Sequence, residues 1–274
     1  MIEPQGSVLR VVANGLEHRV LSYGDNTGPA ALILPGITST ALTAEFMALA
    51  LAERFQVYVP DLRGRGGTDR ASDGHYLLDD YAEDVTGLIR TLDLRRPVIV
   101  GHSLGARIAA AYSVRSSGAH EQLVLVDPPL SGPRRAAYPT TRADFDAQLQ
   151  DAYRGTTVEE LRKWYPRWPE RELQIRAQEL PTCDREAVLT THDNFHREDF
   201  FPYWRRLRQP ALLIRGARSP VVTDAGAEQL RAANPGIPIV TVADAGHMVP
   251  WDNWPGFRTQ LLNYLFAPTG ASSV

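Results

Sequence analysis

Short runs of apolar residues, separated by segments with helical spacing, restrict the fold of this chain more than any other feature of its sequence. They cover residues 31–34, 56–59, 97–100, 123–126, 211–214 and 237–242. A strand with one face in water alternates apolar and polar residues, whereas a strand that helices cover on both faces is apolar throughout. The pattern therefore predicts an α/β fold with a mostly parallel sheet flanked by helices.

The N-terminal segment predicts two more strands. Residues 8–12 and 18–23 are rich in β-forming side chains, and Asn14 and Gly15 between them are typical of a hairpin turn. This hairpin brings the expected sheet to eight strands.

Residues 131–208 interrupt the alternation of strands and helices. Proline and glycine residues follow Asp127, and the next segment is polar, rich in arginine and helical in composition, without an apolar strand run. Thr157 and Glu160 have the spacing of a capping box at the start of a helix. We expect one core domain, formed by residues 1–130 and 209–274, with a helical cap at residues 131–208 inserted into it.

Composition excludes some classes of partner. The 29 basic and 32 acidic residues give a net charge of −3, so no basic surplus favours nucleic acid or an anionic membrane. No apolar stretch approaches the ~18 residues of a membrane span, and the N-terminus lacks the basic start and apolar run of a secretory signal. Cys183 is the only cysteine, which fits a reducing compartment. We expect a cytoplasmic protein without nucleic-acid or membrane partners; its composition favours no particular oligomeric state.

The strongest sign of chemistry is the sequence GHSLG at residues 101–105, between an apolar run and a helical segment. This G-x-S-x-G pattern places a serine on a tight strand-to-helix turn. The two glycines leave room for the neighbouring strand and helix, and the helix N-terminus directs N–H groups toward the site. Ser103 is therefore the predicted nucleophile.

A serine hydroxyl needs a base, and His247 is the best candidate. It follows Gly246 in the loop after the last expected strand, and a glycine there permits a tight turn toward the sheet edge. The other histidines lie in the hairpin, in connecting segments or in the cap. His102 is next to the serine, but we expect it on the opposite side of the turn.

A carboxylate must orient the histidine and stabilise its cation. The expected chain order is serine, acid, histidine, with the acid after the sixth or the seventh strand. The loop after the seventh strand carries Ser219 where an aspartate is common. Asp127, directly after the sixth strand, is therefore the predicted acid, and Asp224 and Asp244 are the alternatives.

The oxyanion of an acyl-transfer reaction needs two backbone N–H donors. One is predicted at Leu104, the residue after the nucleophile. The other is predicted at Ile37, in the loop LPGITS at residues 34–39. Pro35 replaces a histidine that is usual in this loop, which leaves the N–H donor intact.

Three other patterns have simpler explanations. The sequence DLRGRG at residues 61–66 looks like a phosphate loop, but a structural role is favoured after a strand of this kind. His192 and His196 have metal-ligand spacing, yet they lack the adjacent glutamate of a zinc-protease motif and an obvious third ligand. Cys183 has no evident partner base, so a catalytic thiol is not expected.

Over its whole length the chain resembles the N-formylmaleamate deformylases of bacterial nicotinate breakdown, which have the α/β-hydrolase fold. The resemblance is carried by PGITS at 35–39, GHSLGAR at 101–107, DPPLSGP at 127–133 and AGHMVPWD at 245–252. It implies the triad Ser103, Asp127 and His247, no cofactor and no metal. It also implies hydrolysis of N-formylmaleamate to maleamate and formate.

Such a substrate is small and anionic, and a buried carboxylate usually takes an arginine as its partner. Most basic residues of any chain are surface charges, so each candidate arginine could also be a surface charge without a role in binding. The candidate substrate-binding residues are Arg134 and Arg185, then Arg107 and Arg135, with Tyr138 and Trp168 as cap walls.

Two other functions fit the same residues. The triad could serve an esterase or a carbon–carbon bond hydrolase, since only the pocket separates these activities. Alternatively, the chain could be a ligand-binding receptor that retains the triad without catalysis.

Overall fold

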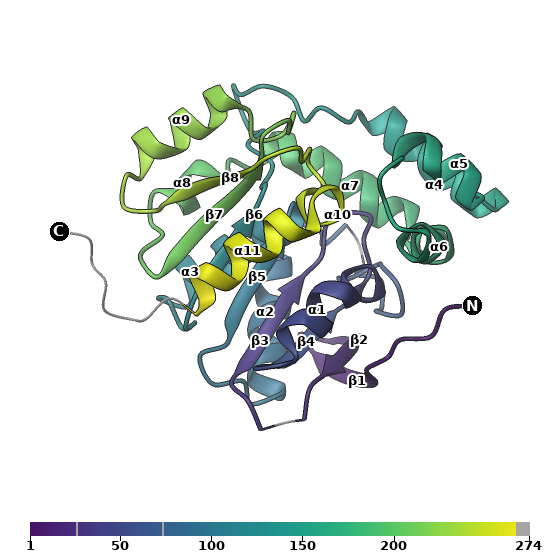
Figure 1. Ribbon diagram of the computed structural model, residues 1–274, viewed down its shortest axis with the longest axis horizontal. Coiled ribbons are helices and arrows are strands. Elements are labelled where there is room, and N and C mark those ends of the chain that lie inside the picture. Colours follow the sequence, from purple (N-terminus) through teal and green to yellow (C-terminus); the bar gives the residue numbers. More distant parts are fainter. Residues whose placement is uncertain (26, 73, 267–274) are drawn as a thin grey trace.

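A computed structural model describes residues 1–25, 27–72 and 74–266 (Figure 1). An eight-stranded sheet forms its centre, in the order β1-β2-β4-β3-β5-β6-β7-β8. β2 runs antiparallel to β1 and β4, and all other neighbours are parallel, which confirms the predicted sheet. The strands are β1 (Ser7–Ala13), β2 (Leu16–Tyr23), β3 (Ala30–Leu34), β4 (Gln56–Pro60), β5 (Val98–His102), β6 (Leu123–Val126), β7 (Ala211–Gly216) and β8 (Ile239–Val242).

Helices cover both faces of the sheet, and this explains the uninterrupted apolar runs. On β5, Ile99 packs into one hydrophobic cluster, whereas Val98 and Val100 pack into the other. The first cluster includes apolar residues of α2 (Leu78–Thr91), α3 (Leu104–Arg115) and α9 (Asp224–Ala233). The second includes those of α1 (Glu45–Leu51) and α11 (Trp254–Leu265), which lie in front of the sheet in Figure 1.

Between β6 and β7 the chain forms helices and, among the described residues, no strand. Thr157 caps α5 and its hydroxyl accepts the N–H of Glu160, which confirms the predicted capping box. In Figure 1 this segment, coloured teal to green, extends from α4, α5 and α6 at the right of the view, through α7, to α8 at the left. Its helices are α4 (Arg142–Arg154), α5 (Val158–Trp164), α6 (Glu170–Glu179), the 3-10 helix η2 (Leu180–Thr182), α7 (Arg185–Arg197) and α8 (Phe201–Trp204).

The carboxyl ends of the parallel strands share one edge of the sheet, and loops at this edge are where open α/β sheets bind ligands. β3 leads to Ile37, β5 to Ser103 and β6 to Asp127. Ser219 follows β7, and His247 lies between β8 and the short helix α10 (Val249–Asp252). Topology alone therefore gathers residues that are far apart in the sequence.

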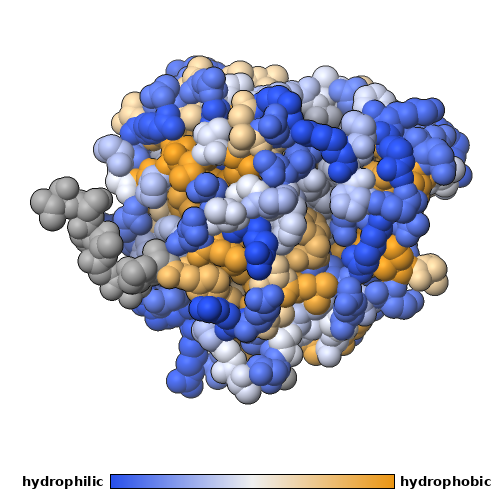
Figure 2. Space-filling model, viewed as in Figure 1, coloured by the Kyte–Doolittle hydropathy of each residue, from blue (hydrophilic) through white to orange (hydrophobic). Residues whose placement is uncertain are grey.

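The surface in Figure 2 is mostly hydrophilic, and its hydrophobic residues form separate patches. Of the helices that the structure describes, none is both long enough and apolar enough to cross a bilayer.

Candidate active site

Ser103 stands on a strained turn between β5 and α3. Its backbone has φ 54° and ψ −116°, a conformation that side chains larger than glycine rarely adopt. The turn is possible only because both flanking glycines lack side chains. A Cβ on Gly101 would lie 2.3 Å from the carbonyl oxygen of Gly105, and a Cβ on Gly105 would lie 2.0 Å from that of Leu34.

The imidazole of His247 connects the serine hydroxyl to a carboxylate. Its Nε2 lies 3.0 Å from Oγ of Ser103, and its Nδ1 lies 2.7 Å from Oδ2 of Asp127. Ser103 is 2% exposed and Asp127 is fully buried. The structure therefore brings together the three residues that the sequence analysis selected.

This geometry sets the proton positions. A carboxylate can only accept, so Nδ1–H of neutral His247 donates to Asp127 and Nε2 keeps its lone pair for the hydroxyl. Burial raises the pKa of Asp127, while the hydrogen bonds from His247 and Ser219 oppose that rise. The arrangement can remove the proton of Ser103 and stabilise the resulting imidazolium.

The two N–H groups predicted to bind the oxyanion belong to Leu104, which follows Ser103, and to Ile37. Leu104 is the first residue of α3, where N–H groups have no intrahelical partner. Ile37 lies in the loop after β3, and within the described residues no hydrogen bond uses the N–H of either residue. Both N–H groups are therefore free to bind a developing oxyanion.

Comparison with known proteins decides the family. A family model described as alpha/beta hydrolase fold matches residues 29–253. The chain belongs to the α/β hydrolase fold family. It is 36% identical to N-formylmaleamate deformylase of Pseudomonas putida, over 94% of this chain and 96% of that protein. It is 30% identical to 2-(acetamidomethylene)succinate hydrolase of Mesorhizobium japonicum, over 81% of this chain and 83% of that protein.

Solved structures agree with these relatives. The crystal structure of N-formylmaleamic acid deformylase Nfo from Pseudomonas putida S16 superposes with a TM-score of 0.86 at 35% identity, covering 93% of this chain and all of that chain. The structure of E-2-(acetamidomethylene)succinate hydrolase gives a TM-score of 0.80 at 27% identity, covering 95% of this chain and 99% of that chain.

The loop after β7 of this α/β hydrolase supports the acid without supplying it. Ser219 Oγ lies 2.5 Å from Oδ2 of Asp127, the same oxygen that faces His247. The alternative acids lie at the surface, since Asp224 is 90% and Asp244 is 75% exposed in their ion pairs with Arg215 and Arg218. The geometry therefore favours Asp127 over both.

His102 anchors the loop that carries the imidazole of His247. Its Nε2 lies 3.0 Å from the backbone carbonyl oxygen of His247, which can only accept, so Nε2–H is the donor. Burial, and to a lesser extent the charge of His247, lower the pKa of His102 to about 3, so this donor is neutral. No role for His102 was predicted from the sequence.

Two buried arginines hold the loop after β3 at residues 34–39, here called the oxyanion loop because it carries the predicted oxyanion donor Ile37; neither arginine was predicted from the sequence. Arg65 donates from Nε to the carbonyl of Ile37 at 3.1 Å. Arg176 of α6 donates to the carbonyl of Thr38 at 2.5 Å and to its hydroxyl at 3.0 Å. The sequence offered a signal only for Arg65, which lies in the DLRGRG segment. Nothing in the sequence distinguishes Arg176 from surface arginines.

Arg176 is also a buried charge without an acidic partner. It is 5% exposed, its Nε is buried without a hydrogen-bond partner, and within the described chain it forms no ion pair. An unpaired buried charge is costly, so such a group favours an anionic ligand nearby.

The arginines that the sequence analysis named are placed elsewhere. Arg134 is exposed, and the half-exposed Arg185 forms two hydrogen bonds with Asp146. Arg135 pairs with Asp199. Arg107 is buried in α3, where its guanidinium donates to backbone carbonyls and burial lowers its pKa to about 10. The structure thus gives no support to Arg134 or Arg185 as carboxylate ligands.

Of the two aromatic residues predicted as cap walls, Tyr138 contacts the triad and Trp168 lies further from it. The hydroxyl of Tyr138 lies 3.3 Å from Nε2 of His247. Trp168 is buried and stacks on Trp251 at a centroid distance of 5.6 Å, and Trp251 in turn lies 5.3 Å from the ring of His102. Tyr138 therefore contacts His247 directly, whereas Trp168 is linked to the triad through Trp251 and His102.

The remaining patterns behave as structural elements. Buried Asp61 of the DLRGRG segment accepts from Arg19 at 2.5 Å and from the N–H of Ala41 at 2.6 Å. No group of three possible metal ligands exists among the described residues, and His192 is held by a bond of 3.0 Å to the carbonyl of Thr140. Burial raises the pKa of Cys183 to about 11, which keeps the thiol protonated.

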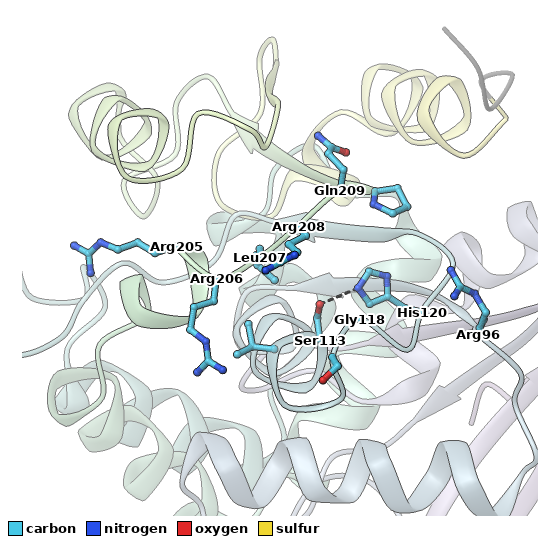
Figure 3. Close-up of a pocket in the computed structure, with 12 residues that line it drawn as sticks. Arg96, Ser113, Gly118, His120, Arg205, Arg206, Leu207, Arg208 and Gln209 are labelled. Atoms are coloured by element: carbon cyan, nitrogen blue, oxygen red, sulfur yellow. Dashed lines mark hydrogen bonds between the residues drawn. The ribbon is translucent and has the colours of Figure 1, made fainter. Parts of the chain in front are cut away.

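A cavity of about 650 Å³ lies away from this site, near the start of β7 (Figure 3). Arg96, Arg205, Arg206 and Arg208 line it together with His120, whose Nε2 lies 2.8 Å from Oγ of Ser113. In Figure 3 the side chains of Arg205 and Arg206 point away from His120 and from each other. Because the arginine side chains do not converge on one point, they do not form an anion-binding site.

Proposed function

We propose that this hydrolase cleaves the formyl C–N bond of N-formylmaleamate, giving maleamate and formate in the breakdown of nicotinate. The observation that carries the proposal is the contact of His247 with both Ser103 and Asp127, in a chain similar along nearly its whole length to N-formylmaleamate deformylase. The second relative is named for an acylated amino compound that also carries carboxylates, so both names point to the same class of substrate.

In the first half of the reaction Ser103 attacks the formyl carbon while Nε2 of His247 takes the hydroxyl proton. Asp127 stabilises the imidazolium through Nδ1. The oxyanion accepts hydrogen bonds from the N–H groups of Ile37 and Leu104. The tetrahedral intermediate then collapses: the C–N bond breaks, its electron pair goes to nitrogen, and His247 returns the proton to that nitrogen.

In the second half water attacks formyl-Ser103. His247 again takes a proton and then gives it to Oγ, which releases formate and restores the enzyme. One water is consumed, and no redox step occurs. The amide nitrogen of maleamate leaves more easily than an amine, because the neighbouring acyl group shares its negative charge.

We assign the substrate carboxylate to Arg176. Arginine binds carboxylates with two parallel hydrogen bonds, and these are strongest where water is excluded. Arg176 is buried beside Thr38, the residue after Ile37, and has no acidic partner in the part of the chain that the structure describes. It takes the role that the sequence analysis gave to Arg134 or Arg185.

We further propose that residues 131–208 act as a cap that closes over the substrate. This segment supplies Tyr138, Trp168 and Arg176, and each contacts a residue of the sheet-edge loops or of α10. Exclusion of water strengthens electrostatic interactions in the site and protects the formyl-enzyme from side reactions.

The test is release of formate and maleamate from N-formylmaleamate by the purified protein, followed by NMR, with Ser103→Ala as the control. We expect stoichiometric products from the wild type and a loss of about 10⁴- to 10⁶-fold in kcat for the variant. Rapid hydrolysis of p-nitrophenyl esters without formate from N-formylmaleamate would instead identify an esterase. Tight binding of a small acid without any turnover would identify a receptor.

A further inference from the structure

Tyr138 places a phenol hydroxyl at the reacting atoms. It is 6% exposed, and its oxygen lies 3.3 Å from Nε2 of His247, the nitrogen that also lies 3.0 Å from Oγ of Ser103. Because Nδ1–H donates to Asp127, Nε2 presents a lone pair to two hydroxyls at once. One hydroxyl belongs to the nucleophile and the other comes from the segment between β6 and β7.

Packing fixes the ring in this position. Tyr138 stacks on Phe145 at a centroid distance of 6.2 Å, and Phe195 lies 5.2 Å away. Burial raises the pKa of Tyr138 well above its ordinary value, and the hydrogen bond to Ser103 offsets only part of that rise. The hydroxyl is therefore a proton-bearing hydrogen-bond donor throughout the neutral pH range.

Three other buried tyrosines use their hydroxyls differently. Tyr23 bonds to Glu45, Tyr81 to Arg65 and Thr191, and Tyr112 to the carbonyl of Ala119. Those contacts join structural elements, as expected of a buried phenol. The Tyr138 hydroxyl instead has the reacting groups as its partners: it lies 3.3 Å from Nε2 of His247 and is hydrogen-bonded to Ser103, which is difficult to explain by structural support alone.

The position beside Nε2 is where a leaving atom must be when it takes the proton from His247. We propose that Tyr138 is a catalytic residue that donates a hydrogen bond to the leaving nitrogen or its conjugated acyl oxygen as the C–N bond breaks. This inference rests on the proposed function, and it explains why the site suits a leaving group that carries negative charge.

The step keeps its atoms and protons balanced. The C–N electron pair moves to nitrogen, and the charge spreads to the neighbouring acyl oxygen. The proton comes from Nε2 of His247, while Tyr138 keeps its own proton and stabilises the charge until the transfer is complete. A donor aimed at developing charge in a water-poor site lowers the barrier more than it strengthens substrate binding.

The test compares leaving groups in Tyr138→Phe, which removes only the hydroxyl. The values of kcat/KM for N-formylmaleamate and p-nitrophenyl formate report the steps up to departure of the leaving group. We expect a loss of about 10- to 100-fold with N-formylmaleamate, as for a lost hydrogen bond to a charged group. p-Nitrophenolate leaves without help, so its ester should keep its rate within about 3-fold.

Tyr203→Phe is the matched control, because its hydroxyl bonds to Asp79 at 3.1 Å, away from the triad. It should leave both rates unchanged. Equal losses of Tyr138→Phe on both substrates, or no loss on N-formylmaleamate, would overturn the proposal.

A separate series of substrates tests the role of Tyr138 if the proposed function is wrong. If the wild type releases no formate from N-formylmaleamate, the substrate assignment fails, and alkyl and aryl formates of increasing alcohol pKa then test Tyr138 alone. The loss in Tyr138→Phe should grow as the leaving alcohol becomes poorer. A loss that does not depend on the leaving group would overturn the role of Tyr138.

Discussion

Ser219 donates its only hydroxyl proton to Asp127. The oxygen of Ser219 accepts the backbone N–H groups of Val221 at 3.0 Å and Val222 at 3.3 Å, so its proton points to Oδ2 of Asp127 at 2.5 Å. That oxygen also accepts from Nδ1 of His247. The loop after β7 therefore fixes the orientation of an acid that the loop after β6 supplies.

Ser219→Ala should lower kcat/KM by about 3- to 30-fold, as for loss of one hydrogen bond to a charged group. Ser219 lowers the pKa of Asp127, so its removal makes the carboxylate easier to protonate. Asp127 must be ionised to act, so the acid limb of the kcat/KM profile should move to higher pH. Ser219→Thr keeps the hydroxyl and should recover most of the activity. An unchanged pH profile in Ser219→Ala would contradict the role.

Asp127→Asn should lower kcat by about 10⁴-fold, because the amide favours the wrong imidazole tautomer. Since Ser219 lies next to the same oxygen, adding Ser219→Asp should place a carboxylate near Nδ1 and recover about 10-fold or more of that loss. Asp244→Asn is the control, because Asp244 is 75% exposed. Near-normal activity in Asp127→Asn would return the role to Asp224 or Asp244.

Arg176→Gln should raise KM for N-formylmaleamate by about 10- to 100-fold, because a charge-assisted hydrogen bond to the carboxylate is lost. p-Nitrophenyl formate has no carboxylate and should be little affected. Arg185→Gln, which breaks a half-exposed ion pair with Asp146, should leave both substrates unaffected. Equal losses on the two substrates would mean that Arg176 only holds Thr38 and the oxyanion loop.

His102 should make the protein less stable in acid. Its pKa falls from 6.5 to about 3 on folding, so below pH 6.5 the unfolded chain binds a proton that the folded chain does not. The free energy of unfolding contributed by this group is complete above pH 6.5 and is lost as the pH falls toward 3, by at most about 1.4 kcal/mol per pH unit.

Denaturant unfolding of wild type and His102→Gln between pH 4 and 8 would measure this dependence. The glutamine keeps an N–H donor for the carbonyl of His247 but cannot titrate, so its curve should be flatter in acid. Parallel curves for the two proteins would rule out His102 as the source.

The sequence by itself determined the features that depend on neighbouring residues. A strand covered on both faces must be apolar along its length, so the runs around Ile99 and Val124 revealed the parallel sheet. The turn at Ser103 needs glycine on both sides for steric reasons, so this turn could also be predicted from a short segment of sequence. His247 followed from the glycine before it, and Asp127 from the expected order of serine, acid and histidine together with Ser219 in the place of the other usual acid.

Only the tertiary structure decided which polar side chains meet there. Tyr138 and His247 are 109 positions apart, and Arg176 and Thr38 are 138 positions apart. In sequence, Arg176 looks like Arg134 or Arg185, since all three lie in one polar, helical segment. Burial separates them: the packing of α6 against the oxyanion loop removes Arg176 from water, whereas the other two remain exposed. The burial of a side chain and its hydrogen-bond partners depend on contacts between distant segments, and a local sequence pattern cannot predict these contacts.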